Sequence, residues 1–399
     1  MFLRGLTLKN AVDTNNPALV HQLIINDPYR STTVNVPTEG GRTLLVDAIV
    51  KGNPEIVEEL LQAGAYVNTR TTRMQHTPLM FAAERGLDPI TQILIKHGAD
   101  VNLTDTRGMT ALMFASRGAH YMVVIALLGA GADPHMVHSI GSTALMFAAK
   151  KDHPDIVIAL LGAGAAVNHS NEDGLTALMF AAQKGHEQVA LTLLGAGAAV
   201  DQTDEDRWTA LMHATENGHE QVSLTLLEAG AVVGAQNNEG MTALMIAARY
   251  GHKQVSLTLL DAGAVVGAQD NEGKTALMFA ALDGHQEMVD ALLEAGAVVG
   301  TPDNAEWTAL MCAAINGHQE IVDALLKVGA NPEATQNQGF TALMMAAQNG
   351  HKQVALTLLG VGVNPDEASN QGYTALMLAS QYGHHDIANT LRTKVRKLS

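Results

Sequence analysis

Histidines are the residues whose spacing most invites a chemical role in this sequence. Nine of the seventeen recur in one slot of a 33-residue pattern: His120, His153, His186, His219, His252, His285, His318, His351 and His384. A row of imidazoles suggests a metal site, because imidazole nitrogen is a common metal ligand. However, Zn–N bonds are about 2 Å long, whereas histidines on neighbouring packed helices are separated by the helix spacing of roughly 8–10 Å. Histidines placed one per unit cannot share an ion, and the adjacent pair His384 and His385 lies on a helix surface by its spacing. We therefore expect structural histidines, no metal site and no cofactor.

The sequence gives equally little support for nucleophilic catalysis. The single cysteine, Cys312, occupies a slot that holds Phe147, Phe180 and Phe279 in other units, so we expect a buried structural thiol rather than a nucleophile. The sequence contains no Gly-x-x-x-x-Gly-Lys, His-Glu-x-x-His or Gly-x-Ser-x-Gly motif. It therefore predicts a protein that is not an enzyme.

The elements that position these residues repeat with the same period. A threonine that opens the phrase Thr-Ala-Leu-Met returns every 33 residues: Thr110, Thr143, Thr176, Thr209, Thr242, Thr275, Thr308, Thr341 and Thr374. Within one period, residues 177–182 form a short apolar helix, and a second helix carries Val189, Leu193 and Leu194 on one face. Polar stretches at 168–173 and 201–206 supply the loops between units. Such self-similarity predicts a stacked-repeat architecture in which each unit buries its apolar face against its neighbours.

These phrases resemble those of the ankyrin repeat, whose hallmark is Thr-Pro-Leu-His and then a Gly-His turn. Here the closest match reads Thr77-Pro78-Leu79-Met80, and the resemblance extends from about residue 5 to residue 392. It implies an all-α, elongated right-handed solenoid of about twelve units, each a helix-turn-helix with a β-hairpin loop. One departure is systematic, because methionine replaces the family's histidine in ten units: Met80, Met113, Met146, Met179, Met212, Met245, Met278, Met311, Met344 and Met377. We interpret this row as core filler, since a thioether cannot donate the hydrogen bond that the histidine makes.

The chain divides, on this pattern, into three segments. Residues 1–42 form a degenerate N-terminal capping repeat, residues 43–372 form ten ankyrin repeats, and residues 373–399 form a C-terminal capping repeat with a short basic tail. The tail contains four cations, Arg392, Lys394, Arg396 and Lys397, which complement a helix C-terminus.

Charge and composition restrict the kinds of ligand and the cellular compartment that we expect for this protein. The net charge is −16, and the stretch 201–333 holds 20 acidic against 5 basic residues, which argues against a nucleic-acid ligand. No apolar run is long enough for a membrane span or a signal peptide. One cysteine fits a reducing compartment, so we expect a cytoplasmic protein. We also expect the protein to be a monomer. Repeat arrays with methionine in this slot are similar to those found in protists and in intracellular bacteria. If the source is an intracellular bacterium, secretion into a host cell is the alternative to a cytoplasmic location.

The variable positions indicate where a partner would bind. Ankyrin proteins generally contact partners at the hairpin tip, directly before the threonine, and at the end of the first helix, on the concave face. The aromatic and apolar residues at these two positions in the C-terminal half are the candidate binding residues: Trp208, Met241, Tyr250, Trp307, Phe340, Tyr373 and Tyr382. Trp and Tyr are common interface anchors. The resemblance thus implies a non-catalytic interaction scaffold that binds a basic or mixed-charge protein, although the same row could instead seal neighbouring hairpins.

Two other functions remain open at this stage. The array could be a substrate for asparagine hydroxylation at Asn68, Asn102 and Asn168, although the same slot holds glycine at Gly234 and at two later units, Gly267 and Gly300. Alternatively, it could be a targeting subunit of a larger complex whose activity lies on another polypeptide.

Overall fold

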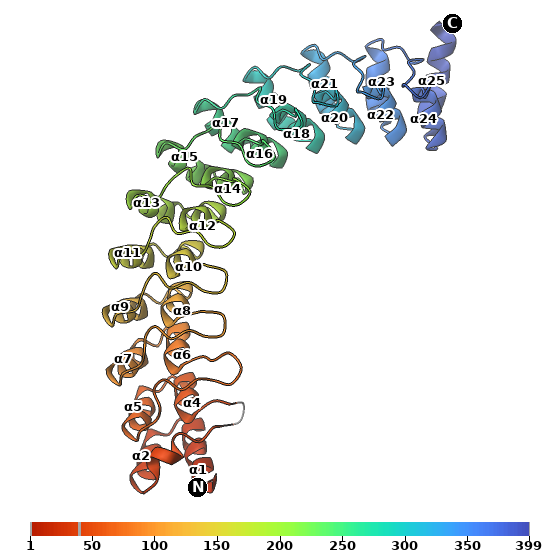
Figure 1. The fold of residues 1–399 in the computed structure, drawn as a ribbon. Helices are drawn as coiled ribbons and strands as arrows, with labels where there is room; N and C mark the ends of the chain where they lie inside the picture. Colours follow the sequence, from red (N-terminus) through yellow and green to blue (C-terminus); the bar gives the residue numbers. More distant parts are fainter. Residues whose placement is uncertain (1, 39–40, 399) are drawn as a thin grey trace. The chain divides into compact units, whose positions relative to one another are not determined.

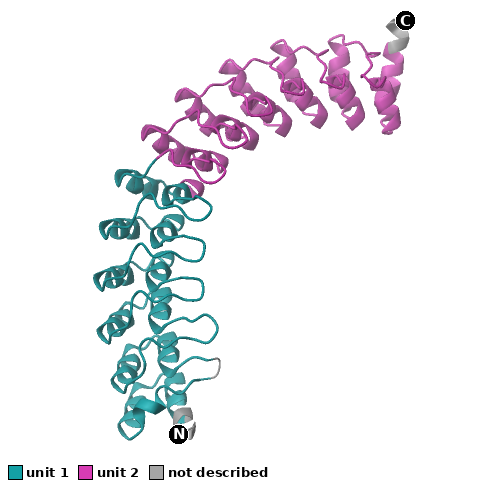
Figure 2. Cartoon of the chain, in the orientation of Figure 1, with its two compact units in different colours: residues 1–181, 186–199 teal, residues 182–185, 200–399 magenta. Residues whose placement is uncertain are grey.

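The protein is built from short helices that follow one another in pairs (Figure 1). The computed structural model describes residues 2–38 and 41–398, and these residues form 25 helices. They divide into two compact units, residues 1–181 with 186–199 and residues 182–185 with 200–399, which are described separately (Figure 2). The predicted all-α repeat fold is confirmed.

The first unit contains twelve complete helices, and α12 (Ala177–Lys184) is shared between the two units. The twelve are α1 (Phe2–Asp13), α2 (Pro17–Ile25), α3 (Arg30–Thr33), α4 (Leu44–Lys51), α5 (Pro54–Gln62), α6 (Pro78–Arg85), α7 (Asp88–Lys96), α8 (Ala111–Arg117), α9 (Tyr121–Gly129), α10 (Ala144–Lys150), α11 (Pro154–Gly162) and α13 (Glu187–Gly195).

The second unit contains the remaining twelve helices. They are α14 (Ala210–Glu216), α15 (Glu220–Glu228), α16 (Ala243–Tyr250), α17 (Lys253–Asp261), α18 (Ala276–Asp283), α19 (Gln286–Glu294), α20 (Ala309–Asn316), α21 (Gln319–Lys327), α22 (Ala342–Asn349), α23 (Lys352–Gly360), α24 (Ala375–Gln381) and α25 (His385–Leu398).

Each unit has two layers of helices. In the second unit α14, α16, α18, α20, α22 and α24 pack in sequence as first helices, and α15, α17, α19, α21, α23 and α25 pack in sequence as second helices. The first unit is built likewise, with α4, α6, α8 and α10 in one layer and α5, α7, α9, α11 and α13 in the other. The core lies between the layers, where side chains such as Leu244 and Leu259 are fully buried. In the first unit, Figure 1 shows the hairpin loops beside the first helices, on the side that faces away from the second helices.

The repeated threonine begins each first helix. In α16 the Thr242 hydroxyl accepts a hydrogen bond from the Met245 N–H, which satisfies one of the unpaired donors of the first turn. The Thr242 N–H in turn donates to the Met245 thioether sulfur at 3.5 Å. Thr43 makes no such side-chain contact at the start of α4.

The methionine row is buried in nine of its ten units, as core filler should be. Each of these methionines also donates its N–H to the threonine, and in three units its sulfur accepts the threonine N–H in return: Met80, Met179 and Met245. The prediction is wrong for Met377, which is 53% exposed. Its helix, α24, packs against α22 in the first-helix layer and against α25.

The recurrent histidines connect neighbouring repeats. In eight of the nine, Nε2–H donates to a backbone carbonyl 36 residues earlier, at 2.9–3.3 Å. His252, for example, binds the Glu216 carbonyl at the end of α14. A glycine at the end of the preceding first helix leaves room for the histidine of the next repeat: at Gly251, where φ is +74°, a Cβ would lie 2.6 Å from Nδ1 of His285. These histidines therefore have a structural role.

The predicted segments 1–42, 43–372 and 373–399 remain a prediction. The side chains of Arg396 and Lys397 in the basic tail lie outside the described part of the chain. No helix within the described ranges is long and apolar enough to cross a membrane.

Candidate functional site

The candidate site is the hairpin face of the second unit, defined here as the hairpin tips and the last turns of the first helices. A short polar side chain builds four of these tips. Asp204, Asn237, Asp270 and Asp303 each accept, through Oδ1, the N–H groups two and four residues further on, at 2.8–3.1 Å. This closes the turn and fixes the backbone of the tip residue, which is Trp208, Met241, Lys274 or Trp307.

A ladder of asparagines connects successive tips. Asn238, Asn271, Asn304, Asn337 and Asn370 each donate the side-chain Nδ2–H to a carbonyl 33 residues earlier, at 2.9–3.4 Å. Their backbone N–H groups donate to the preceding hairpin as well, as Asn304 N–H does to the Glu272 carbonyl. The hairpin face is therefore a continuous hydrogen-bonded edge within the second unit.

Trp208 lines the first of two pockets on this face. The Trp208 pocket has a volume of about 360 Å³ and lies between the hairpin of Trp208 and the next one. Its lining residues are Asp204, Asp206, Trp208, His213, Glu216, Asn237, Asn238 and Glu239. Four carboxylates thus surround it, and no lysine or arginine is among the lining residues.

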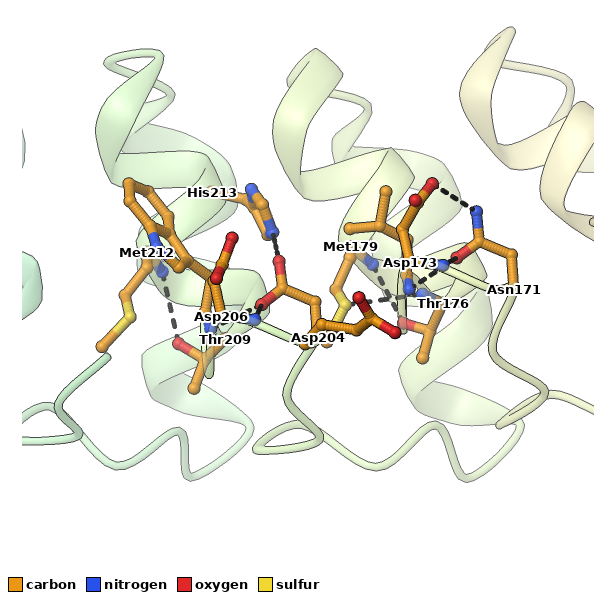
Figure 3. A network of polar contacts seen from close by, with 12 residues as sticks. Asn171, Asp173, Thr176, Met179, Asp204, Asp206, Thr209, Met212 and His213 are labelled. Atoms are coloured by element: carbon orange, nitrogen blue, oxygen red, sulfur yellow. Dashed lines mark hydrogen bonds and ion pairs between the residues drawn. The ribbon is translucent and has the colours of Figure 1, made fainter. Parts of the chain in front are cut away.

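His213 is the buried polar group of this pocket. Its Nε2 lies 3.0 Å from Oδ2 of Asp204, and the side chain stands 5.4 Å from the Trp208 ring, centroid to centroid. Because a carboxylate only accepts, Nε2 carries the proton. Figure 3 shows one ring nitrogen of His213 on the contact to Asp204 and the other directed away from it. That second nitrogen, Nδ1, is buried and has no hydrogen-bond partner.

Trp307 lines the second pocket, of about 510 Å³, between its own hairpin and the preceding one. Here Lys274 pairs with Glu272, and the contact lowers the pKa of the Glu272 carboxyl and raises that of the Lys274 ammonium. Cys312 also lines this pocket but is itself buried. Burial, with a smaller contribution from Asp303, raises its pKa to about 12. As predicted, the thiol is buried.

The three tyrosines among the candidate residues are exposed, but only one of them lies beside a pocket. Tyr250 is 47% exposed and its hydroxyl donates to Oε1 of Glu216 at 3.3 Å, which places it beside the Trp208 pocket. Burial, with the charge of Glu216, raises its pKa. Tyr373 and Tyr382 are 37% and 52% exposed and line neither pocket.

The remaining tip residues among the candidates are partly or fully buried. Trp208, Trp307 and Phe340 are half-buried. Met241, another candidate binding residue, is only 3% exposed, so it offers a partner little surface. Its N–H donates to Oδ1 of Asn237, and its flexible, unbranched side chain is able to fill an irregular space in the core. Met109 is buried at the same position of an earlier repeat.

Sequence reasoning missed the contact between Asp204 and His213. His213 occupies the slot that holds Phe147 and Phe180 in other units, but its separation of nine residues from Asp204 gives no sign in the sequence that the two side chains meet. The asparagine ladder had a signal, the 33-residue interval from Asn238 to Asn370, which could have been read with the threonines.

The asparagines considered for hydroxylation have structural contacts in the first unit. Oδ1 of Asn68, Asn102 and Asn168 accepts a backbone N–H of the next repeat at 2.7–2.9 Å, and Nδ2 donates to a carbonyl there at 3.2–3.5 Å. Both ends of each carboxamide are thus engaged, which accounts for these residues without a modification.

Metal ligation is not supported by the side-chain arrangement. Over residues 2–38 and 41–398, no three His, Cys, Asp or Glu side chains are grouped so that they could hold an ion. His384, one of the adjacent pair, donates to the Gln348 carbonyl.

Comparison with known proteins gives consistent matches along the chain. A family model described as ankyrin repeats, in three copies, matches residues 8–105, 71–137, 112–204, 193–270, 257–336 and 324–397.

Three curated proteins are similar over shorter segments. The chain is 41% identical over 69 residues to glycerophosphocholine phosphodiesterase gde1 of Schizosaccharomyces pombe, which is 17% of this chain and 6% of that protein. It is 26% identical over 108 residues to the ankyrin repeat protein FPV018 of Fowlpox virus (27% and 15%). It is 35% identical over 71 residues to Dauer abnormal formation protein 25 of Caenorhabditis elegans (18% and 18%). The matches thus span less than a fifth of each relative.

Proposed function

This chain belongs to the ankyrin-repeat family, and we propose that it is a non-catalytic protein that binds a partner protein on the hairpin face of its second unit. Ankyrin repeats generally mediate protein–protein interaction, and the fold is typically non-catalytic. The similarity to a phosphodiesterase covers only 6% of that enzyme, so its activity is not carried over to this chain.

One observation supports the position of the binding surface. Both tryptophans of the chain lie at hairpin tips, and each lines an open pocket on the same face of the second unit. A half-buried indole beside a pocket is already held in place, so little side-chain entropy is lost when a partner covers it. Tyr250, Tyr373 and Tyr382 supply exposed aromatic surface along the same face.

Charge indicates the kind of partner. The stretch 201–333, which builds most of the second unit, has 20 acidic and 5 basic residues. Complementary charge directs encounter and selects among partners. We therefore propose a partner that is basic or of mixed charge, bound by a monomer of this chain.

Affinity capture from the source cells tests this function. The wild-type chain should retain a specific protein that the double variant Tyr250→Ala, Trp307→Ala loses. The matched control is Tyr121→Ala, because Tyr121 is 44% exposed, close to the value for Tyr250, but begins the second-layer helix α9. A partner lost equally with Tyr121→Ala, or kept by the double variant, would place the binding surface elsewhere.

A further inference from the structure

Four first helices of the first unit each have a cation in the last turn. These cations are Lys51 in α4, Arg85 in α6, Arg117 in α8 and Lys150 in α10, and we call them the basic row. The four helices pack in sequence (Figure 1), so their last turns follow one another along the hairpin face of this unit. Arg85 shows how close these turns lie, because its guanidinium donates to the Val50 carbonyl in the last turn of α4.

Helix formation alone does not account for the basic row. A cation at a helix C-terminus can complement the helix dipole. The second unit forms the same helices without it, since α18, α20, α22 and α24 have no basic residue in the last turn. The stretch 201–333 also holds 20 of the 40 acidic residues but only 5 of the 24 basic ones. The basic row is thus a distinctive property of the first unit.

Carboxylates neutralise only part of this row. Glu84 forms an ion pair with Arg117 at 3.3 Å, but both side chains stay partly exposed, and such pairs contribute little. Asp105, in the adjacent hairpin, is buried and accepts two N–H groups of its own turn. Lys51 and Lys150 are exposed and have no ion pair within the described ranges of the chain. Positive charge is therefore available to an anionic ligand.

Aromatic rings beside the row are a second, independent feature. The guanidinium carbon of Arg117 lies 5.2 Å from the centre of the Phe114 ring. Phe114 meets the hairpin residue His76 edge-on, with ring centroids 5.3 Å apart, and His76 meets Phe81 in the same way at 5.4 Å. His76 and Phe81 are half-buried. A partly exposed aromatic surface thus connects the row with the hairpin.

The same arrangement recurs around α10. Nζ of Lys150 lies 5.0 Å from the centre of the Phe180 ring, and the half-buried Phe147 meets His138 of its hairpin edge-on at 5.2 Å. Surfaces lined by aromatic rings suit extended, proline-containing segments, because the polyproline II helix is already ordered before it binds.

Spacing indicates which anionic chain fits the row. Packed helices lie roughly 8–10 Å apart, so the row offers about one cation in each such interval. A polyproline II helix has three residues per turn and rises about 3.1 Å per residue, so every third side chain lies on one face, about 9 Å apart. A strand of duplex DNA has one phosphate per about 3.4 Å, which is far denser than the cations. The interval therefore favours a peptide.

We propose that the hairpin face of the first unit binds an extended acidic segment of a partner protein in the polyproline II conformation. Carboxylates at every third residue of the segment face the basic row, and the residues between them pack on the rings of Phe81 and Phe147. The exposed acids Glu172 and Asp173, at the tip after α10, limit the surface by repulsion. This inference goes beyond the proposed function, since it concerns the other unit and a ligand of opposite charge.

Fluorescence anisotropy of labelled, blocked peptides tests the proposal on the full chain. The probe consists of four Glu-Pro-Pro triplets. One comparison peptide has the same composition, with its four glutamates together between two runs of four prolines, and another consists of four Gln-Pro-Pro triplets. We expect the clustered peptide to bind at least about 5-fold more weakly than the probe, and the neutral peptide at least about 10-fold more weakly.

Two double variants locate the binding surface. Arg117→Gln with Lys150→Gln should weaken binding of the probe at least about 5-fold, because both charges face it. The matched control, Arg30→Gln with Lys96→Gln, removes the same charge from exposed positions of the first unit outside the hairpin face. It should change binding less than about 2-fold, since charges beyond a Debye length of about 8 Å are largely screened at physiological salt.

Each result either supports or overturns the inference. No binding of the probe, equal affinity for the two acidic peptides, or equal losses from the two double variants would overturn it. Tighter binding of an oligouridylate of equal length would also overturn it and assign the row to a nucleic acid. The inference and the proposed function fail separately, because Tyr250→Ala with Trp307→Ala should bind the probe as the wild type does, and Arg117→Gln with Lys150→Gln should still capture the partner of the second unit.

Discussion

At the scale of single residues, burial governs the chemistry of Cys312. The thiol is buried in α20, and the loss of hydration raises its pKa to about 12, from an ordinary value of 9.0. The reactive form of cysteine is the thiolate. At about pH 8 the folded protein should therefore react with a disulfide reagent at least about 100-fold more slowly than the urea-unfolded protein. Stopped-flow measurement of both rates checks this, and similar rates would mean that the thiol is accessible in the folded state.

The same shift has a defined effect on stability. Because the folded pKa lies above the unfolded one, the unfolded chain releases its proton first as the pH rises. The contribution of the thiol is thus complete below about pH 9 and is lost between about pH 9 and about pH 12, by roughly 1.4 kcal/mol per pH unit. Comparing the free energy of unfolding of the wild type with that of Cys312→Ala cancels the other titrating groups. A constant difference over this range would contradict the shifted pKa.

Side-chain shape also decides which tip residues are available to a partner. Met241 and Met109 occupy the tip position and are buried, whereas Trp208 and Trp307 at the same position are half-buried and line pockets. In the sequence alone, these four residues occupy equivalent positions of the repeat. Methionine is unbranched and flexible and fills irregular core spaces, whereas an indole is large and rigid, which agrees with the observed difference in burial.

At the scale of the elements, the hairpins are held together through close backbone approach. Gly273 has φ of +84°, and a Cβ there would lie 2.7 Å from Oδ1 and 2.8 Å from N of Asn304 in the next hairpin. Gly263 has nearly the same φ, +88°, with nothing within 4 Å of the added Cβ. The two positions therefore share the conformational constraint and differ only in the approach of a neighbour.

We expect Gly273→Ala to be more destabilising than Gly263→Ala. The left-handed conformation alone costs about 1–2 kcal/mol for alanine, and displacing the Asn304 backbone should add about 1–3 kcal/mol at Gly273. Urea unfolding of both variants measures the difference. Equal losses would show that the asparagine ladder yields without strain, and that the tips are less firmly coupled than their hydrogen bonds indicate.

The elements themselves were predictable from the sequence, and their polar contacts were only partly so. The Thr-Ala-Leu-Met phrase marks a cap followed by buried positions, and the glycine before seven of the nine recurrent histidines marks a helix end, so the helix pairs follow from local chemistry. The contact of His252 with the Glu216 carbonyl joins residues 36 apart, and Asp204 meets His213 across a turn. Such contacts depend on how neighbouring repeats stack, which a single unit does not specify.

At the scale of the whole molecule, stability should be distributed along the array. Leu259 in α17 and Leu391 in α25 are both fully buried, but α17 packs against second-layer helices on both sides, α15 and α19, whereas α25 packs against α23 and α24. In a stack governed by nearest neighbours, a central defect weakens two interfaces and a terminal one weakens one.

We therefore expect Leu259→Ala to cost roughly 2–5 kcal/mol and to reduce amide protection in the repeats on either side. Leu391→Ala should lower protection in α24 and α25 and leave the repeats around α17 unchanged. Hydrogen exchange followed by mass spectrometry distinguishes the two patterns. A uniform loss of protection along the chain from both variants would indicate one cooperative core instead of a stacked array.

Long-range charge is the other property of the whole molecule. The net charge is −16, and the stretch 201–333 accounts for nearly all of it. A field of this sign attracts a cationic ligand before contact and raises the association rate. Salt shortens its range, from a Debye length of about 30 Å at 0.01 M to about 10 Å at 0.1 M.

Association of a basic ligand should accordingly slow as salt is added. For a labelled tetra-arginine peptide, we expect the association rate constant to fall by about 10-fold or more between about 0.01 M and about 0.3 M salt, with a smaller change in dissociation. Stopped-flow fluorescence measures both rates. The tetra-citrulline peptide is the matched control, and its encounter rate should be nearly independent of salt, because it carries no side-chain charge for the field to act on. An arginine peptide whose association is equally insensitive to salt would show that the acidic stretch does not direct encounter at the hairpin face.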